Sequence, residues 1–188
     1  PPRSTLFPYT TLFRSAKLKK STHGGTVKKV TFVVGGCRSG KSGHAQKLAE
    51  AAASNLRVYI ATCIPHDEEM KGRVERHRRD RDRNWRTVEA PIALPEAVTA
   101  ASRSGNVVLV DCLTLWTTNL LLSPEASLQI PRHVEALEGA LERSVCPVIL
   151  VSNEVGAGIV PENRLARQFR DVMGRSEEHT SELQSPNT

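Results

Sequence analysis

VTFVVGGCRSGKS, at residues 30–42, is the most informative stretch of this sequence. Its opening residues, Val30–Val34, are apolar and mostly β-branched, which predicts a buried strand. The remainder, Gly35–Ser42, fits the pattern G-x-x-x-x-G-K-[ST], and apolar residues at helical spacing follow from Lys41 to Ala53. A strand, a glycine-rich turn and a helix in this order are the context in which the pattern binds phosphate.

The residue types in the turn explain that chemistry. Glycines allow the backbone to curl so that its N–H groups point at phosphate oxygens, and the positive end of the helix points to the same place. Lys41 can reach the β and γ phosphates, and the Ser42 hydroxyl can bind Mg²⁺. The sequence therefore predicts a nucleoside triphosphate site formed by Gly35, Gly36, Cys37, Arg38, Ser39, Gly40, Lys41 and Ser42.

A second apolar run, VVLVD at residues 107–111, ends in a carboxylate. A buried strand of this kind would place Asp111 at the carboxyl edge of the sheet, where it can hold Mg²⁺ directly or through water. The alternative is an ordinary strand that ends in a polar residue. The phosphate pattern upstream favours the metal role.

The rest of the chain alternates between short apolar runs and helical spacing. Continuously apolar strands that alternate with helices predict an α/β fold, with a mostly parallel sheet covered by helices on both faces. The other expected strands are 58–61, 85–88 and 148–151, and the expected helices are 67–79, 94–102, 113–122, 134–141 and 161–173.

Composition narrows the classes of partner. The 188 residues carry a net charge of +6, which favours anionic ligands, and no apolar run approaches the ~18 residues of a membrane span. Of the eight aromatic residues, three lie in the first fifteen, so a stacking platform for nucleic acid is not expected. The four cysteines form no C-x-x-C pair or zinc-type spacing, which favours reduced thiols in a cytoplasmic enzyme.

The two ends of the chain differ from the middle. Residues 1–15 and 176–188 resemble translations of DNA-sequencing adapters. The alternative is a genuine disordered tail at each end. We therefore expect one domain at 16–175 between two non-native flanks, with the natural C-terminus missing.

A basic segment at residues 71–83 surrounds His77. The segment could be a solvated helix with internal ion pairs, a nucleic-acid patch or a cluster that neutralises a triphosphate. Acidic residues within it weigh against simple binding to a nucleic-acid backbone. An exposed histidine without a role is the ordinary expectation, but an imidazole whose pKa is lowered by arginines could also attack phosphorus. The basic residues are Lys71, Arg73, Arg76, Arg78, Arg79, Arg81 and Arg83.

Several segments together resemble one enzyme family. They are GGCRSGKS, VYIAT, RVERHRRDRDRNWRTVEAP, VVLVDCLTLWTTNLL and VSNEVGAGIVPENRLARQFRD. Their order is similar to that of the bifunctional adenosylcobinamide kinase/adenosylcobinamide-phosphate guanylyltransferases of cobalamin biosynthesis. The resemblance implies a RecA-like P-loop NTPase fold, here C-terminally truncated, commonly assembled as a homotrimer.

The resemblance also implies two reactions and their residues. Adenosylcobinamide is phosphorylated with ATP or GTP, and GMP then passes from GTP to the product through a GMP–histidine intermediate, which gives adenosylcobinamide-GDP and pyrophosphate. His77 matches the modified histidine, and Lys41 belongs to the catalytic phosphate loop. Many members have Glu where this chain has Asp111. The further positions that match nucleotide contacts are Ala61, Thr62, Cys63, Arg78, Arg79, Asp80, Arg81, Glu89 and Asp111.

Two other functions stay open on the sequence. One is a small-molecule kinase without transferase activity, in which His77 would be dispensable. The other is a P-loop ATPase module that acts on nucleic acid or a protein partner. The corrinoid pocket is not located by any motif, although Asn153, Glu154 and the segment to Arg164 are candidates.

Overall fold

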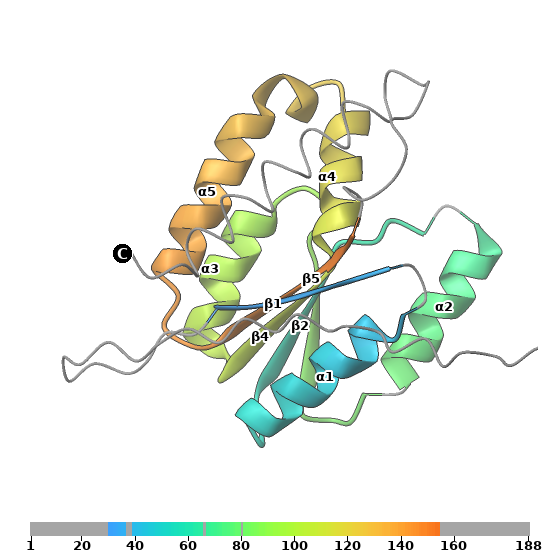
Figure 1. The fold of residues 1–188 in the computed structure, drawn as a ribbon, viewed down its shortest axis with the longest axis vertical. Helices are drawn as coiled ribbons and strands as arrows, with labels where there is room; N and C mark the ends of the chain where they lie inside the picture. Colours follow the sequence, from blue (N-terminus) through green and yellow to red (C-terminus); the bar gives the residue numbers. More distant parts are fainter. Residues whose placement is uncertain (1–29, 37–38, 66, 80, 155–188) are drawn as a thin grey trace, which may run out of the picture.

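The computed structural model describes residues 30–36, 39–65, 67–79 and 81–154. Strands and helices alternate along this part of the chain, as the sequence predicts (Figure 1). In chain order the elements are β1 (Val30–Gly35), α1 (Lys41–Ala52), β2 (Arg57–Ala61), α2 (Glu68–Arg79), β3 (Trp85–Glu89), α3 (Leu94–Ser104), β4 (Val107–Asp111), α4 (Leu113–Leu122), the 3₁₀ turn η1 (Ala126–Gln129), α5 (Ile130–Glu142) and β5 (Val148–Asn153).

The five strands form one parallel sheet in the order β1-β5-β4-β2-β3. The phosphate-loop strand β1 and the aspartate strand β4 are therefore separated by β5. The register aligns the carboxyl ends, since Gly35 pairs with Asn153, and Ala61 pairs with both Asp111 and Glu89. Residues that the sequence places after separate strands thus meet along one edge of the sheet.

Helices cover both faces of the sheet (Figure 1). Helix α1 packs on one face through Ala45 and Ala49, which are fully buried against β4 and β5. Helices α3, α4 and α5 cover the other face, where the indole of Trp116 is buried and its Nε1 donates to the Ile92 carbonyl at 2.8 Å. Two apolar layers on one sheet confirm the predicted α/β class with helices on both faces.

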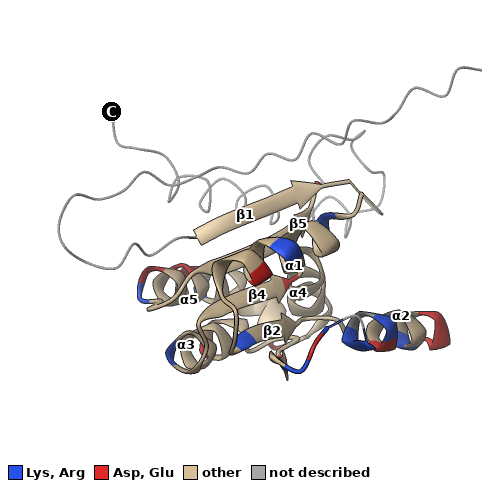
Figure 2. Cartoon of the chain, turned by 90° about the horizontal axis from the view of Figure 1, so that it is seen from below, with Lys and Arg blue, Asp and Glu red and all other residues tan. Residues whose placement is uncertain are grey.

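Helix α2 differs from the others because it projects from the body (Figures 1 and 2). It carries most of the basic segment, and Figure 2 shows basic and acidic residues along its length. Its free-standing position follows from its sequence, which offers Met70 and Val74 as the only large apolar side chains described on it.

Most predicted boundaries are correct to within two residues, and the start of α5 is the main error. The helix expected at 134–141 begins at Ile130, with Pro131 in its first turn, where a missing N–H leaves no hydrogen bond unmade. The 3₁₀ turn before it was not predicted. The helix expected at 161–173 and the domain boundary at 175 lie outside the described residues.

Candidate active site

A cavity of about 560 Å³ opens at the carboxyl edge of the sheet. Its lining comes from the phosphate loop and the start of α1, from the ends of β2, β3, β4 and β5, and from one side of α2. This size is typical of small-molecule sites. Because these elements are distant in sequence, the cavity exists only after the sheet has formed.

The phosphate loop forms one wall of the cavity. Gly40 has φ +82°, a left-handed conformation that favours glycine, and it lies immediately before α1. A Cβ at Gly35 would lie 2.8 Å from Ser39 Oγ, so a side chain there would displace this hydroxyl of the phosphate loop. Lys41 is 8% exposed, and its Nζ donates to the Gly36 carbonyl at 3.1 Å. Lys41 is thus held against the phosphate loop, where it is expected to bind the phosphates of the nucleotide.

Two polar atoms at the cavity are buried without a hydrogen-bond partner among the described residues. They are Ser39 Oγ, in the phosphate loop, and Arg81 Nη1, which follows α2. A buried polar group without a partner is costly unless a ligand or water satisfies it. A hydroxyl and a guanidinium N–H are both donors, so an anionic ligand suits them.

Asp111 lies at the end of β4 and accepts a hydrogen bond from the Tyr59 hydroxyl, 2.9 Å from Oδ2. The guanidinium carbon of Arg81 lies 3.6 Å from the centroid of the Tyr59 ring. Burial and the negative charge of Asp111 hold the pKa of Tyr59 well above its ordinary range, so its hydroxyl stays a donor. Burial lowers the pKa of Arg81, which nevertheless stays charged at neutral pH. Tyr59 lies in the VYIAT segment, but no sequence pattern assigned it a role.

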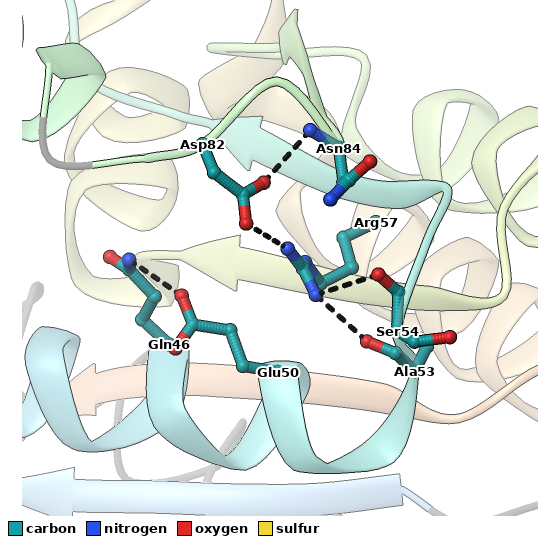
Figure 3. Close-up of polar contacts among 7 residues, drawn as sticks. All are labelled: Gln46, Glu50, Ala53, Ser54, Arg57, Asp82 and Asn84. Atoms are coloured by element: carbon teal, nitrogen blue, oxygen red, sulfur yellow. Dashed lines mark hydrogen bonds and ion pairs between the residues drawn. The ribbon is translucent and has the colours of Figure 1, made fainter.

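Helix α2 is anchored to the body at its C-terminal end. The Arg78 guanidinium donates to Glu89 Oε1 at 2.6 Å, which ties α2 to the end of β3. Farther along, Arg57 donates to Asp82 and to the carbonyls of Ala53 and Ser54 (Figure 3). The end of α1, the start of β2 and the segment after α2 are thereby joined through one side chain.

One face of α2 borders the cavity. Met70, Val74 and Arg78 line it, and they recur every four residues along the helix. Position 77 follows Val74 by three residues and Met70 by seven, so its backbone belongs to this same face. For His77 and Arg73 the structure describes the backbone alone.

Thr62 holds the end of β2 to the start of α4. Its fully buried hydroxyl donates to the Cys112 carbonyl at 2.7 Å and accepts from the Cys112 amide at 2.8 Å. Asn119 Nδ2 donates to the Thr62 carbonyl at 2.7 Å. The sequence places Thr62 among the nucleotide contacts, but the structure uses its side chain to join two loops beneath the cavity.

The predicted site residues gather unevenly around the cavity. Ten of them line it: Ser39, Gly40, Lys41, Ser42, Ala61, Cys63, Arg78, Arg81, Glu89 and Asp111. Gly35 and Gly36 belong to the loop behind it, and Arg79 lies on α2 away from the lining. Cys37, Arg38 and Asp80 lie outside the described residues. Asn153 borders the cavity, whereas residues 155–164 are outside the described part.

A protein-only metal site is absent from the described parts of the chain, where no three His, Cys, Asp or Glu side chains gather to hold an ion. Ser42 and Asp111 nevertheless both line the cavity. Their hydroxyl and carboxylate oxygens suit Mg²⁺, which commonly takes one or two protein ligands together with phosphate oxygens and water.

The comparisons with known proteins identify the family. A model of the CobU family, described as cobinamide kinase / cobinamide phosphate guanyltransferase, matches residues 31–185. The chain belongs to this family. Among its relatives is the Bifunctional adenosylcobalamin biosynthesis protein CobU of Escherichia coli K12, 44% identical over 156 residues, which cover 77% of this chain and 85% of that protein. Another is the CobP protein of Pseudomonas aeruginosa, 45% identical over 144 residues, with 76% of this chain and 82% of the relative covered.

The CobU protein of Salmonella typhimurium LT2 is 43% identical over 156 residues, 77% of this chain and 85% of its own length. Among solved structures, a KaiC-like protein from Pyrococcus horikoshii matches with a TM-score of 0.45 and 13% identity, over 76% of this chain and 69% of that one. Membership of the CobU family confirms the prediction of a bifunctional kinase and guanylyltransferase of cobalamin biosynthesis. It also favours that enzyme over a kinase without transferase activity and over an ATPase module.

Proposed function

We propose that the chain phosphorylates adenosylcobinamide with ATP or GTP and then transfers GMP from GTP to adenosylcobinamide phosphate. The second reaction passes through a GMP–histidine intermediate at His77 and yields adenosylcobinamide-GDP and pyrophosphate. The family assignment supports the two half-reactions. One observation supports a site shared by both reactions: the phosphate loop and one face of α2 line the same cavity.

In the kinase reaction, the hydroxyl oxygen of the aminopropanol arm attacks the γ phosphorus. The bond from the γ phosphorus to its bridging oxygen breaks, the nucleoside diphosphate leaves with the electron pair, and the hydroxyl proton is lost. Lys41 and the N–H groups of the phosphate loop stabilise the charge on the phosphates. The buried position of Lys41 strengthens this effect because little water screens it.

In the guanylyl transfer, a neutral imidazole nitrogen of His77 attacks the α phosphorus of GTP. A P–N bond forms, the bond from the α phosphorus to the β-phosphate oxygen breaks, and pyrophosphate leaves. A phosphate oxygen of adenosylcobinamide phosphate then attacks the same phosphorus, and the P–N bond breaks to restore His77. Arg78, on α2, and Arg81, just after α2, both line the cavity and stabilise the developing negative charge.

Mg²⁺ completes the proposal. Ser42 and Asp111 would hold it, and it would supply positive charge to the phosphates. Asp111 is one methylene shorter than the Glu of many relatives, but its Oδ2 is already fixed by Tyr59 at the cavity.

The proposal further includes a cytoplasmic location and a homotrimer. Light scattering after gel filtration can test the trimer. Of the described helices, none is long and apolar enough to cross a membrane. The corrinoid is proposed to approach beside Asn153, at the end of β5.

The deciding experiment incubates the protein with Mg²⁺ and GTP labelled at its α phosphate. We expect a covalent label that is labile in acid and stable in alkali, as phosphoramidates are. His77→Ala should abolish the label while GTP binding, followed with a fluorescent analogue, persists. His133→Ala, on α5 across the sheet, is the matched control and should label normally. Lys41→Ala should lose both label and binding. Labelling that survives in His77→Ala would reject the nucleophile.

A further inference from the structure

Tyr59 lies in the middle of β2 and is one of the residues that line the cavity. We propose that Tyr59 is a positioning residue that holds the Asp111 carboxylate with its hydroxyl and the Arg81 guanidinium with its ring face, both toward the bound nucleotide. This inference rests on the proposed function, in which Asp111 binds Mg²⁺ and Arg81 binds the nucleotide.

The hydroxyl contact orients the carboxylate. Tyr59 donates to Oδ2 of Asp111 at 2.9 Å, across 52 positions of sequence. The contact is built into the sheet, because β2 and β4 are paired with Ala61 opposite Asp111. With Oδ2 engaged, rotation of the carboxylate is restricted and Oδ1 is left for a further ligand. Partners of this kind, which orient a metal-binding group without touching the metal, commonly strengthen metal affinity.

The ring face supports the guanidinium. Arg81 lies over Tyr59 with its central guanidinium carbon 3.6 Å from the ring centroid, within the range of a cation–π contact. Its Nη1 is buried and lacks a hydrogen-bond partner in the described parts of the chain. A guanidinium that rests on a ring with an N–H unused is prepared to bind an anion without first breaking a protein contact.

The ring itself cannot move freely. Tyr59 is 9% exposed, and Trp85 packs edge-on against it with centroids 6.3 Å apart and an interplanar angle of 77°. One rigid side chain therefore fixes an anionic and a cationic group at the same cavity. Because the two contacts use different atoms of Tyr59, substitutions can separate them.

Two variants make that separation. Tyr59→Phe keeps the ring beneath Arg81 and removes only the hydroxyl, whereas Tyr59→Leu removes both contacts. The measurement is the Kd of a fluorescent GTP analogue, taken in excess Mg²⁺ and again in EDTA, with Tm recorded for every variant. Asp111→Asn and Arg81→Met serve as references for the two contacts.

For Tyr59→Phe we expect an affinity loss of about tenfold in Mg²⁺ and none in EDTA. Tyr59→Leu should weaken binding in both conditions, and Arg81→Met should do the same. In the Asp111→Asn background, Tyr59→Phe should have no further effect on the Mg²⁺ dependence, because the group it positions is gone.

A purely structural role for Tyr59 makes a different prediction. In that case, substitution of Tyr59 would lower Tm while the difference in Kd between Mg²⁺ and EDTA stayed at the parental value. That result would overturn the inference. Parental Mg²⁺ dependence of GTP-analogue binding in Asp111→Asn would overturn it as well, because it would show that Asp111 does not hold the metal. Failure of the His77 labelling test would leave these binding results unaffected, so the two proposals can fail separately.

Discussion

Arg57 and Asp82 form an ion pair in which the guanidinium Nη2 lies 2.6 Å from the carboxylate Oδ2. The Arg57 side chain is 5% exposed, and the carboxylate is 54% exposed. The pair joins the end of α1, which begins at the phosphate loop, to the segment that follows α2 (Figure 3). Two helices that border one cavity are thus held by a contact outside that cavity.

The pH dependence of stability should reveal this contact. Hydrogen bonds from the Asn84 backbone and from Arg57 lower the pKa of Asp82 below its ordinary 3.8. A lowered folded-state pKa stabilises the fold above the unfolded value, and the contribution is lost as the pH falls through the folded value. Asp82→Asn should therefore have a lower Tm than the parent at pH 7, with the two curves converging below about pH 4.

Thermal unfolding followed by circular dichroism across this pH range measures the effect. Glu125→Gln, an exposed carboxylate before η1, is the control and should follow the parent throughout. A Tm difference for Asp82→Asn that stays constant with pH would show that the carboxylate charge is not the cause.

The ion pair between Arg78 and Glu89 should matter for ligand binding more than for stability. Both side chains are more than half exposed, and such pairs contribute about 1 kcal/mol or less. Arg78→Met should therefore leave Tm nearly unchanged while GTP affinity falls about tenfold, since the charged contact to phosphate that we propose for Arg78 is removed. Arg103→Met, at the end of α3, is the matched control.

A charge reversal tests whether the pair acts only by its geometry. The double variant Arg78→Glu/Glu89→Arg can form the ion pair in the opposite sense. We expect it to remain weak in GTP binding, because neither new side chain suits the nucleotide. Parental affinity in the double variant would mean that the pair merely holds α2 in place.

Alkylation should distinguish two cysteines at the site. Cys63 and Cys112 both line the cavity, but Cys112 is only 5% exposed. Burial and Asp111 raise the pKa of the Cys112 thiol to about 11. Iodoacetamide reacts with thiolates, so at pH 8 Cys112 should stay unmodified and Cys63 should react. Mg-GTP at ten times its Kd should slow the Cys63 reaction about tenfold. Peptide mass spectrometry measures both rates, and an unchanged Cys63 rate would place the nucleotide elsewhere.

Removal of the Thr62 hydroxyl should destabilise the fold. Thr62→Val keeps the shape of the side chain but removes both hydrogen bonds to the Cys112 backbone. We expect the free energy of unfolding to fall by about 1–3 kcal/mol, because buried backbone groups lose their partner. Urea denaturation measures the change, and Thr62→Ser should recover most of it. If Val were tolerated without loss, water would have to replace the hydroxyl.

Local patterns predicted most of the fold and part of the site. The helix Leu113–Leu122 has its predicted bounds, and the phosphate loop lies between a strand and a helix as expected. These features are encoded by neighbouring residues, through periodicity and the freedom of glycine. The start of α5 was mispredicted because proline in a first turn resembles a break in the pattern.

The contacts between distant segments could not be read in this way. Tyr59 looked like an ordinary core residue, Arg57 belonged to no motif, and Asp82 lay in the basic segment without a role assigned to it. Their roles depend on strand order and register, which place β2 beside β4 and β3.

The linear order of residues was enough to specify a parallel α/β chain with a phosphate loop, because strand, turn and helix signals act over a few residues. Folding alone determined that Tyr59 would contact both Asp111 and Arg81, and that one face of α2 would line the same cavity as the phosphate loop. The physical reason is that such contacts depend on sheet pairing and side-chain packing across dozens of positions, for which a single sequence carries no local signal.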